Sequence, residues 1–356
     1  MPAETAHSSW AERAFALGGT VTDDTDGAVY RVSRYLGRGG MGEVHEVVRA
    51  DTGARYALKC LLLQHAGNSK TIERTRREAL ALRELRHPNV VRVHATGVRE
   101  DGLIWMVMDL LCGHTLGAVK RRLGRLPLPW ALRIGADVAA GLTAVHAYAV
   151  HRDVKLENVH LGDDGIVRVL DLGAGKFHRS GLLTTGDGTL GTVPYMSPEQ
   201  LSLGPGVDGR SDLFSLGVVV TELISGVHPF APSGLACENV YSLVRKIVSD
   251  TPVSLRGFAP WVPDYVARTV DRALARRRED RWASAAELRD AFAGDLERLT
   301  REVGGGAPLS TLVDELNRGE ASNVAGPALA RPEAKVEPGP ATVDDEADTA
   351  VMGRNF

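Results

Sequence analysis

Apolar and polar positions alternate along the chain from about Tyr30 to about Lys59, with a turn of sequence Asp51-Thr52-Gly53 between two halves of the stretch. An alternation with a period of two predicts β-strands. Farther along, apolar positions recur at helical spacing, and helices are predicted over 69–86, 130–148, 212–225 and 284–299. A strand-rich front followed by a helix-rich back predicts a two-lobed α+β fold.

Both ends of the chain lack this periodicity. Residues 1–28 mix Ser, Thr, Asp and Gly, which predicts a flexible leader. Residues 300–356 shift toward Gly, Ala, Pro and acidic side chains, which predicts a largely disordered acidic tail with one short helix near Leu309–Leu316. The ordered domain is therefore expected over 29–299.

Composition and charge narrow the classes of function. The 356 residues are 44% hydrophobic and 24% charged with a net charge of -3, which is typical of a globular protein and implies no nucleic-acid partner. Cys60, Cys112 and Cys237 match no metal-ligand spacing, so free thiols in a reducing compartment are expected. The apolar stretches are too short to span a bilayer and no signal sequence is visible, so a cytoplasmic protein without membrane association is predicted.

A glycine-rich segment, Gly37-Arg38-Gly39-Gly40-Met41-Gly42, fits the spacing G-x-G-x-x-G. Glycines at this spacing let backbone amides approach phosphate oxygens. In a dinucleotide-binding fold the glycines open a helix, but here 43–48 has a strand pattern, so the loop is predicted to join two strands. That arrangement favours a flap over the phosphates of ATP, and an ordinary glycine-rich hairpin is the alternative.

A lysine, Lys59, ends the apolar strand that follows this loop. Its head is expected to point into the cleft between the lobes, although a lysine lying along the surface is the alternative. In the next predicted helix Glu78, Leu82 and Leu85 share one face. A carboxylate on an apolar face needs a partner, because an unpaired buried charge is costly, so Glu78 is predicted to pair with Lys59.

Catalytic chemistry is indicated by residues 151–158, of sequence His-Arg-Asp-Val-Lys-Leu-Glu-Asn, and by Asp171. A hairpin is predicted between these segments, so Asn158 and Asp171 are expected together at its open end. Two hard oxygen ligands that face phosphates constitute a predicted magnesium site. Asp153 lies one short loop earlier and is expected to orient an incoming hydroxyl and act as its base.

These motifs, in this order, resemble the eukaryotic-type (Hanks-type) serine/threonine protein kinase family, bacterial members above all, over about residues 30–295. The resemblance implies a protein-kinase-like fold with a small β-rich lobe over about 29–108, a hinge over 109–113 and a helical lobe over about 114–299. It further implies transfer of the γ-phosphoryl group of ATP to protein serine and threonine hydroxyls in a signalling role, with Mg²⁺ as cofactor and Mn²⁺ as an alternative.

The resemblance also carries residue roles. Lys155 is similar to the lysine that contacts the γ-phosphate, Ser197-Pro198-Glu199 matches an A-P-E signature in which Glu199 pairs with Arg281, and Asp212 matches the aspartate that braces the catalytic loop. The residues implied to bind nucleotide are Leu36, Gly37, Gly39, Gly40, Gly42, Val44, Ala57, Lys59, Met108 as gatekeeper, Asp109 and Leu111 in the hinge, and His160 beneath adenine.

Regulation is predicted from threonines and charges. The irregular segment 171–199 contains Thr184, Thr185 and Thr189, which are candidates for autophosphorylation, Thr184 and Thr185 foremost. Arg152 is expected to bind a phosphothreonine there, whereas Thr192 resembles a threonine that bonds the catalytic aspartate. In the tail, Thr342 lies three residues before Asp345, a spacing that suits phosphothreonine-reading forkhead-associated domains; a solvated tail without a partner is the alternative.

Three positions depart from the common family pattern: Leu156, Leu172 and His160. The first two are expected to be tolerated, whereas a polar ring at His160 is expected to weaken or retune nucleotide binding, or to be a tolerated edge contact. A pseudokinase scaffold is one rival, although Lys59, Asp153, Asn158 and Asp171 are all retained. A small-molecule phosphotransferase is the other, and Ser197-Pro198-Glu199 argues against it.

Overall fold

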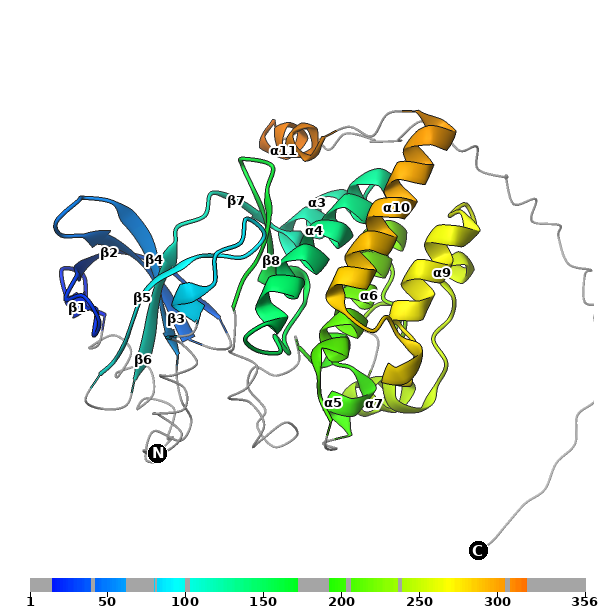
Figure 1. Cartoon of the computed structure of the whole chain (residues 1–356), viewed down its shortest axis with the longest axis horizontal. Helices are drawn as coiled ribbons and strands as arrows, with labels where there is room; N and C mark the ends of the chain where they lie inside the picture. Colours follow the sequence, from blue (N-terminus) through cyan, green and yellow to red (C-terminus); the bar gives the residue numbers. More distant parts are fainter. Residues whose placement is uncertain are drawn as a thin grey trace, which may run out of the picture.

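The computed structural model describes residues 15–39, 42–61, 80, 82–99, 103–171, 192–202, 206–235, 239–304 and 308–318. These residues form a β-rich lobe and a helical lobe that lie side by side, which is the predicted two-lobed arrangement (Figure 1). The chain passes from the first lobe to the second through the hinge that follows strand β6.

The small lobe is one antiparallel sheet of strand order β1-β2-β3-β4-β6-β5. Its strands are β1 Thr20–Thr22, β2 Val29–Gly39, β3 Gly42–Arg49, β4 Arg55–Leu61, β5 Val93–Val98 and β6 Ile104–Asp109. Each face of the sheet joins a different hydrophobic cluster, because neighbouring side chains of a strand point to opposite faces. On β4, Leu58 and Cys60 belong to the outer cluster, whereas Ala57 belongs to the core shared with the helical lobe. Lys59 lies between Leu58 and Cys60 along the strand and two residues after Ala57, so its side chain is on the same face of the sheet as Ala57, toward the helical lobe.

A second, three-stranded sheet of order β7-β8-β9 lies between the hinge and the helices. Its strands are β7 Gly113–Thr115, β8 Val159–Gly162 and β9 Val167–Val169. Each strand adjoins a predicted site segment, since β7 follows the hinge, β8 follows Asn158 and β9 precedes Asp171. This sheet therefore sets the spacing between the hinge, the predicted catalytic loop and the predicted metal ligands.

Helices make up the large lobe, and α6 lies at its centre. The helices are α3 Leu116–Leu123, α4 Leu128–His146, α5 Pro198–Leu201, α6 Gly209–Ser225, α7 Val240–Ser249, α8 Leu255–Phe258, α9 Asp264–Ala273, α10 Ala285–Val303 and α11 Leu309–Asn317. Every residue of α6 from Ser211 to Ile224 is buried, which is the pattern of a helix surrounded by protein on all sides. Helix α6 begins at the N-cap Asp208 and ends at Gly226 in the left-handed conformation.

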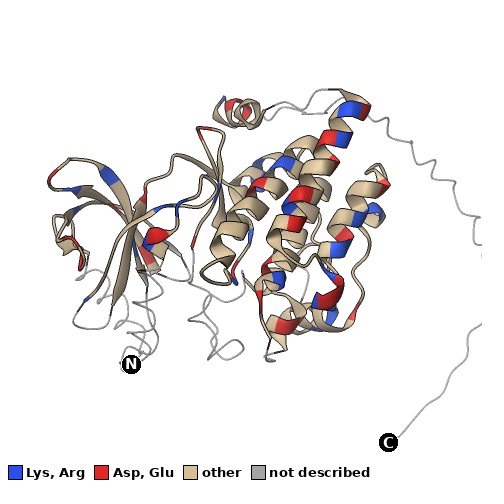
Figure 2. Ribbon diagram, in the orientation of Figure 1, with Lys and Arg blue, Asp and Glu red and all other residues tan. Residues whose placement is uncertain are grey.

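The surface helices carry mixed charge. Helix α10 carries both acidic and basic residues along its length (Figure 2), and Ser284 caps the helix by accepting a hydrogen bond from the Glu287 N–H, at the predicted start. Interleaved charges of both signs agree with the small net charge of the chain.

The ordered part of the chain is longer at both ends than predicted. A flexible leader over 1–28 is wrong for 15–28, because β1 pairs with β2, Phe15 is buried and Asp23 forms an ion pair with Arg83. A disordered tail from residue 300 is likewise wrong for 300–304, because α10 continues to Val303. The short helix predicted near Leu309–Leu316 is confirmed as α11. Burial of apolar side chains explains both extensions.

Candidate active site

The glycine-rich segment forms a hairpin between β2 and β3, as predicted. Gly37 pairs with Val44 and Gly39 with Gly42, while Gly40 lies outside the described residues. Leu36, just before the glycines, is 39% exposed, and Val44 packs against the core that the two lobes share. A strand-to-strand hairpin excludes the helix-opening glycine motif of dinucleotide-binding folds.

Lys59 forms an ion pair with Asp171. The distance from Lys59 Nζ to Asp171 Oδ1 is 2.5 Å, and the two side chains are 8% and 20% exposed. The predicted partner Glu78 lies outside the described residues. Lys59 therefore reaches the cleft from the small lobe, as predicted, and meets there a carboxylate of the large lobe.

Asp212 holds the catalytic loop from beneath, at the start of α6. Its carboxylate accepts hydrogen bonds from the backbone N–H groups of His151 at 2.8 Å and Arg152 at 2.7 Å, and from His146 Nε2 at 2.8 Å. Arg152 has φ of 67°, which is rare for a residue with a side chain. A strained backbone persists only where surrounding contacts determine it, and the two hydrogen bonds to Asp212 do so here.

Asp153 projects from this loop with a side chain that is 1% exposed. Its Oδ2 accepts a hydrogen bond from Asn158 Nδ2 at 2.7 Å and lies 3.1 Å from Lys155 Nζ. Its Oδ1 has no hydrogen-bond partner within the described part of the chain. A buried carboxylate oxygen without a partner is costly, so this atom is suited to accept a hydrogen bond from a bound hydroxyl.

Asn158 and Asp171 lie together at the open end of the β8–β9 hairpin, as predicted. The Asn158 carbonyl accepts a hydrogen bond from the Leu170 N–H at 2.8 Å, one residue before Asp171. Asn158 directs its amide nitrogen to Asp153, so its side-chain oxygen faces away from that residue. Asp171 has φ of 61°, a second unusual backbone value beside the cleft. An amide oxygen and a carboxylate suit Mg²⁺, which prefers hard oxygen ligands.

Hydrophobic side chains line the predicted adenine side. Ala57 and Met108 are paired across β4 and β6 and are 8% and 9% exposed, and Leu111 packs against the same core. Asp109 begins the hinge and accepts a hydrogen bond from His94 Nε2 at 2.6 Å. Burial raises the pKa of Asp109, but the contacts with His94, the Arg92 backbone and Arg168 together lower it more, so the net pKa is below the ordinary value.

His160 is buried on β8, with 7% exposure, opposite Thr115 and Arg168. Burial lowers its pKa, and the nearby charge of Arg168 lowers it further, so the ring is neutral at pH 7. Its Nδ1 has no hydrogen-bond partner among the residues that the structure describes. A neutral, partly unsatisfied ring thus replaces the aliphatic side chain that the family resemblance implies.

A polar network fixes the segment that begins at Thr192 to the loop that carries Asp153. Lys155 Nζ donates to Thr192 Oγ1 at 2.8 Å, and Gln200 Nε2 donates to the Arg152 carbonyl at 3.0 Å. Thr192 was expected to bond Asp153; the contact that the structure has runs through Lys155, which touches both residues. The threonines Thr184, Thr185 and Thr189 lie outside the described residues.

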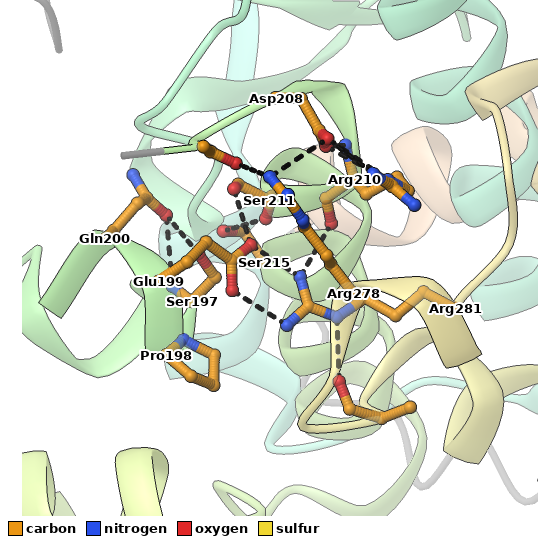
Figure 3. Close-up of polar contacts among 12 residues, drawn as sticks. Ser197, Pro198, Glu199, Gln200, Asp208, Arg210, Ser211, Ser215, Arg278 and Arg281 are labelled. Atoms are coloured by element: carbon orange, nitrogen blue, oxygen red, sulfur yellow. Dashed lines mark hydrogen bonds and ion pairs between the residues drawn. The ribbon is translucent and has the colours of Figure 1, made fainter. Parts of the chain in front are cut away.

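The predicted ion pair between Glu199 and Arg281 is present (Figure 3). The distances from Arg281 Nη1 and Nη2 to the Glu199 oxygens are 2.7 and 2.9 Å, and the arginine side chain is 0% exposed. Its remaining N–H groups donate to backbone carbonyls of Arg210, Ala275 and Arg276. Burial raises the pKa of Glu199, but the contacts with Arg281 and Ser211 together lower it more. The net pKa is below the ordinary value, so the carboxylate is charged at neutral pH.

Three supporting contacts have no signal in the sequence. The buried Glu222 of α6 accepts a hydrogen bond from Tyr195 Oη at 2.6 Å and contacts Lys120 of α3. Asn89 Nδ2 donates to the Val167 carbonyl at 2.8 Å and so connects the small lobe with β9. All three contacts join segments that are far apart along the chain, and no local spacing indicates them.

Comparison with known proteins adds independent findings. Residues 30–291 match the family model described as protein kinase domain. The chain is 34% identical over 269 residues to serine/threonine-protein kinase PknA of Mycobacterium tuberculosis, covering 74% of this chain and 60% of that relative. It is 37% identical over 276 residues to serine/threonine-protein kinase PksC of Streptomyces coelicolor, covering 74% of this chain and 48% of PksC.

Among solved structures, the crystal structure of the Mycobacterium tuberculosis PknI kinase domain is similar, with a TM-score of 0.59 and 28% identity. That alignment covers 79% of this chain and 99% of the PknI chain. The chain thus spans 60% or less of the length of the two curated relatives named above but almost all of a kinase domain. Within the described residues, every helix is too short or too polar to cross a membrane.

Proposed function

Because the chain belongs to the protein kinase family, we propose that it transfers the γ-phosphoryl group of ATP to serine and threonine hydroxyls of proteins. One observation carries the proposal: Lys59 pairs with Asp171, Asn158 bonds Asp153, and the residue before Asp171, Leu170, donates its N–H to the Asn158 carbonyl. Such a constellation of one ammonium with carboxylate and amide oxygens is what phosphoryl transfer with a divalent metal requires.

Asp153 is the proposed base and orienting group. Its buried Oδ1 would accept the proton of the attacking hydroxyl, while Asn158 holds Oδ2 and so fixes the plane of the carboxylate. Lys155, which lies 3.1 Å from Asp153 Oδ2, would contact the γ-phosphate. Catalysis would then come mainly from positioning and from electrostatic stabilisation.

Asn158 and Asp171 are the proposed metal ligands. Bound Mg²⁺, or Mn²⁺ as an alternative, would neutralise charge that develops on the transferred phosphoryl group. Lys59 would hold the α- and β-phosphates, with Glu78 as its proposed partner when the site is assembled. The contact of Lys59 with Asp171 supports this placement, because it brings the lysine head to a proposed metal ligand.

The nucleotide would lie between the glycine hairpin and the hinge. The proposed contact residues are Leu36, Gly37, Gly39, Gly40, Gly42, Val44, Ala57, Met108, Asp109, Leu111 and His160. Ala57, Met108 and Val44 belong to or pack against one hydrophobic core, which supports an apolar slot for the base.

The test is incubation of the full chain with labelled ATP and Mg²⁺ together with a serine- and threonine-containing peptide library. Label on serine and threonine is expected, and mass spectrometry locates it. Asp153→Asn is the matched control, because it keeps the shape of the side chain but removes the base. If wild-type protein bound ATP and yet labelled nothing, while Asp153→Asn bound equally, a nucleotide-binding scaffold would be favoured.

Autophosphorylation is the proposed means of regulation, with Thr184 and Thr185 as first candidates and Thr189 as a third. Arg152 would bind the phosphothreonine, and its backbone position is fixed by Asp212 and Gln200. Phosphosite mapping of wild type against Thr184→Ala/Thr185→Ala tests this. Lower activity of the double variant is expected, and full activity would contradict regulation through Thr184 or Thr185.

A partner and a location are proposed as well. Phosphorylated Thr342, in the acidic tail, would bind a forkhead-associated domain in a cytoplasmic signalling role. A pull-down with a Thr342-phosphorylated tail peptide, compared with the unphosphorylated peptide, tests the partner. Retention of such a domain by the phosphorylated peptide alone is expected, and equal recovery on both peptides would contradict it.

A further inference from the structure

Helix α11 lies beyond residues 30–291, which the family model matches, and yet it is part of the hydrophobic core. Its buried side chains are Leu309, Leu312, Val313 and Leu316, which recur at the spacing of one helix face. An isolated helix of nine residues is unstable in water, so docking of this face explains why α11 is helical.

The two ends of α11 mark where it docks. At its first turn, a Cβ added to Gly165 in the β8–β9 turn would lie 3.3 Å from the Ser310 nitrogen, so the backbones approach closely. At its last turn, His114 Nε2 on β7 lies 3.3 Å from Asn317 Oδ1. The helix therefore extends from the β8–β9 turn to β7, and Figure 1 shows it beside this end of the large lobe.

The sheet beneath α11 connects parts of the nucleotide site. Strand β7 follows the hinge directly, and the Asp163 N–H donates to the Cys112 carbonyl at 3.0 Å, so the β8–β9 turn is bonded to the hinge. Strand β8 carries His160, and β9 leads to Asp171. Asp153, in contrast, is held by Asn158 and by the loop contacts to Asp212, which do not involve α11.

We propose that α11 is a positioning element for nucleotide binding, with Leu312 and Leu316 as positioning residues that keep hinge and β8 at the spacing the nucleotide requires. The inference rests on the proposed kinase function. Loss of the docked face leaves the chemistry at Asp153 in place but lets the sheet sample arrangements in which the nucleotide fits poorly. Apparent affinity falls by the fraction of molecules that are competent to bind.

The experiment replaces both buried leucines in the full chain, Leu312→Ser/Leu316→Ser, and compares the exposed-face control Asp314→Ser. The dissociation constant of Mg-ATP is measured by displacement of a fluorescent nucleotide, and kcat and KM are measured on a peptide substrate. We expect the Kd and KM for ATP to rise about tenfold, for a competent fraction of about one tenth, with kcat at saturating ATP within about twofold of wild type. The control is expected to match wild type.

Unchanged ATP affinity in the double variant would overturn the inference, and so would a fall in kcat equal to the loss of affinity, because that would indicate general loss of the active fold. If the double variant does not fold, Leu316→Ala is the second variant, with a smaller rise in KM expected at unchanged kcat; unchanged KM there would equally overturn it. Failure of the proposed function is distinguishable, since wild-type protein itself would then transfer no phosphate.

Discussion

Two groups of charged residues differ in how completely the protein satisfies their hydrogen-bonding atoms. At the start of α6, Asp212 bonds the backbone of His151 and Arg152, Arg281 bonds Glu199 and the Arg210 carbonyl, and both side chains are 0% exposed. In the cleft, Asp153 keeps a buried oxygen without a partner in the described chain, and Asp171 is partly exposed. Groups whose hydrogen-bonding atoms are all paired within the protein support the fold, whereas groups with unpaired hydrogen-bonding atoms are able to bind a ligand.

Removal of the proposed base should give the largest effect and should separate activity from stability. Asp153→Asn is expected to lower the phosphorylation rate about 10²- to 10⁴-fold, because a carboxylate that accepts a proton is lost while its shape is kept. Nucleotide affinity and Tm should stay close to wild type, as measured by titration and by thermal unfolding. Wild-type phosphorylation by this variant would contradict the assignment of Asp153.

The next largest effect is expected beneath the loop, and on stability. Arg281→Met leaves the half-buried Glu199 without its partner, and breaking a buried ion pair costs about 3–5 kcal/mol. Chemical denaturation measures the change. Arg278→Met is the matched control: its side chain is 32% exposed and pairs at the surface with Asp208, so a cost of at most about 1 kcal/mol is expected. Equal losses of unfolding free energy in the two variants would show that the buried ion pair stabilises the protein no more than the exposed one.

The smallest effect is expected at His160. Its side chain is buried, as those of Asp212 and Arg281 are, but its Nδ1 lacks a hydrogen-bond partner in the described chain, as Asp153 Oδ1 does. His160→Leu removes that nitrogen and is expected to stabilise the protein by about 1 kcal/mol, because an unsatisfied buried polar atom is costly. Its nucleotide affinity shows whether the ring contacts the base, and unchanged affinity would indicate a tolerated edge contact.

The dependence of stability on pH sharpens this prediction. Because the pKa of His160 is below 6.5 in the folded protein, the unfolded chain binds more protons just below pH 6.5, and stability is lost as the pH falls through that value. Wild type should therefore lose more Tm than His160→Leu between pH 7.5 and pH 5.5. The charge of Arg168 opposes protonation of the ring, and the neighbouring His114 acts in the same direction, whereas Asp163 and Asp164 favour protonation. If Tm fell equally with pH in wild type and in His160→Leu, protonation of His160 would not be the cause of the loss of stability.

Local patterns in the sequence predicted much of this architecture. The hairpin at Gly37–Gly42, the helices around α4, α6 and α10, and the meeting of Asn158 with Asp171 all depend on period or on short loops, which a sequence displays directly. The ion pair between Glu199 and Arg281 joins distant segments and was expected only from the family resemblance.

Features that depend on tertiary burial were missed. Strand β1 has three residues, so nothing but its pairing with β2 makes it a strand. The contact of Lys120 with Glu222 requires knowledge of how α3 lies on α6, and the pairing of Lys59 with Asp171 depends on how the lobes meet. Propensity and spacing carry no information about such contacts.

An exposed cysteine in the hinge makes it possible to label the junction of the two lobes. Of the two cysteines that the structure describes, Cys60 is fully buried in the small lobe, whereas Cys112 is exposed in the hinge. A thiol-reactive dye on native protein should therefore distinguish the two sites by accessibility, because a buried thiol reacts slowly. Placed beside the junction of the lobes, such a fluorophore would report opening and closing of the molecule as a spectral change in real time.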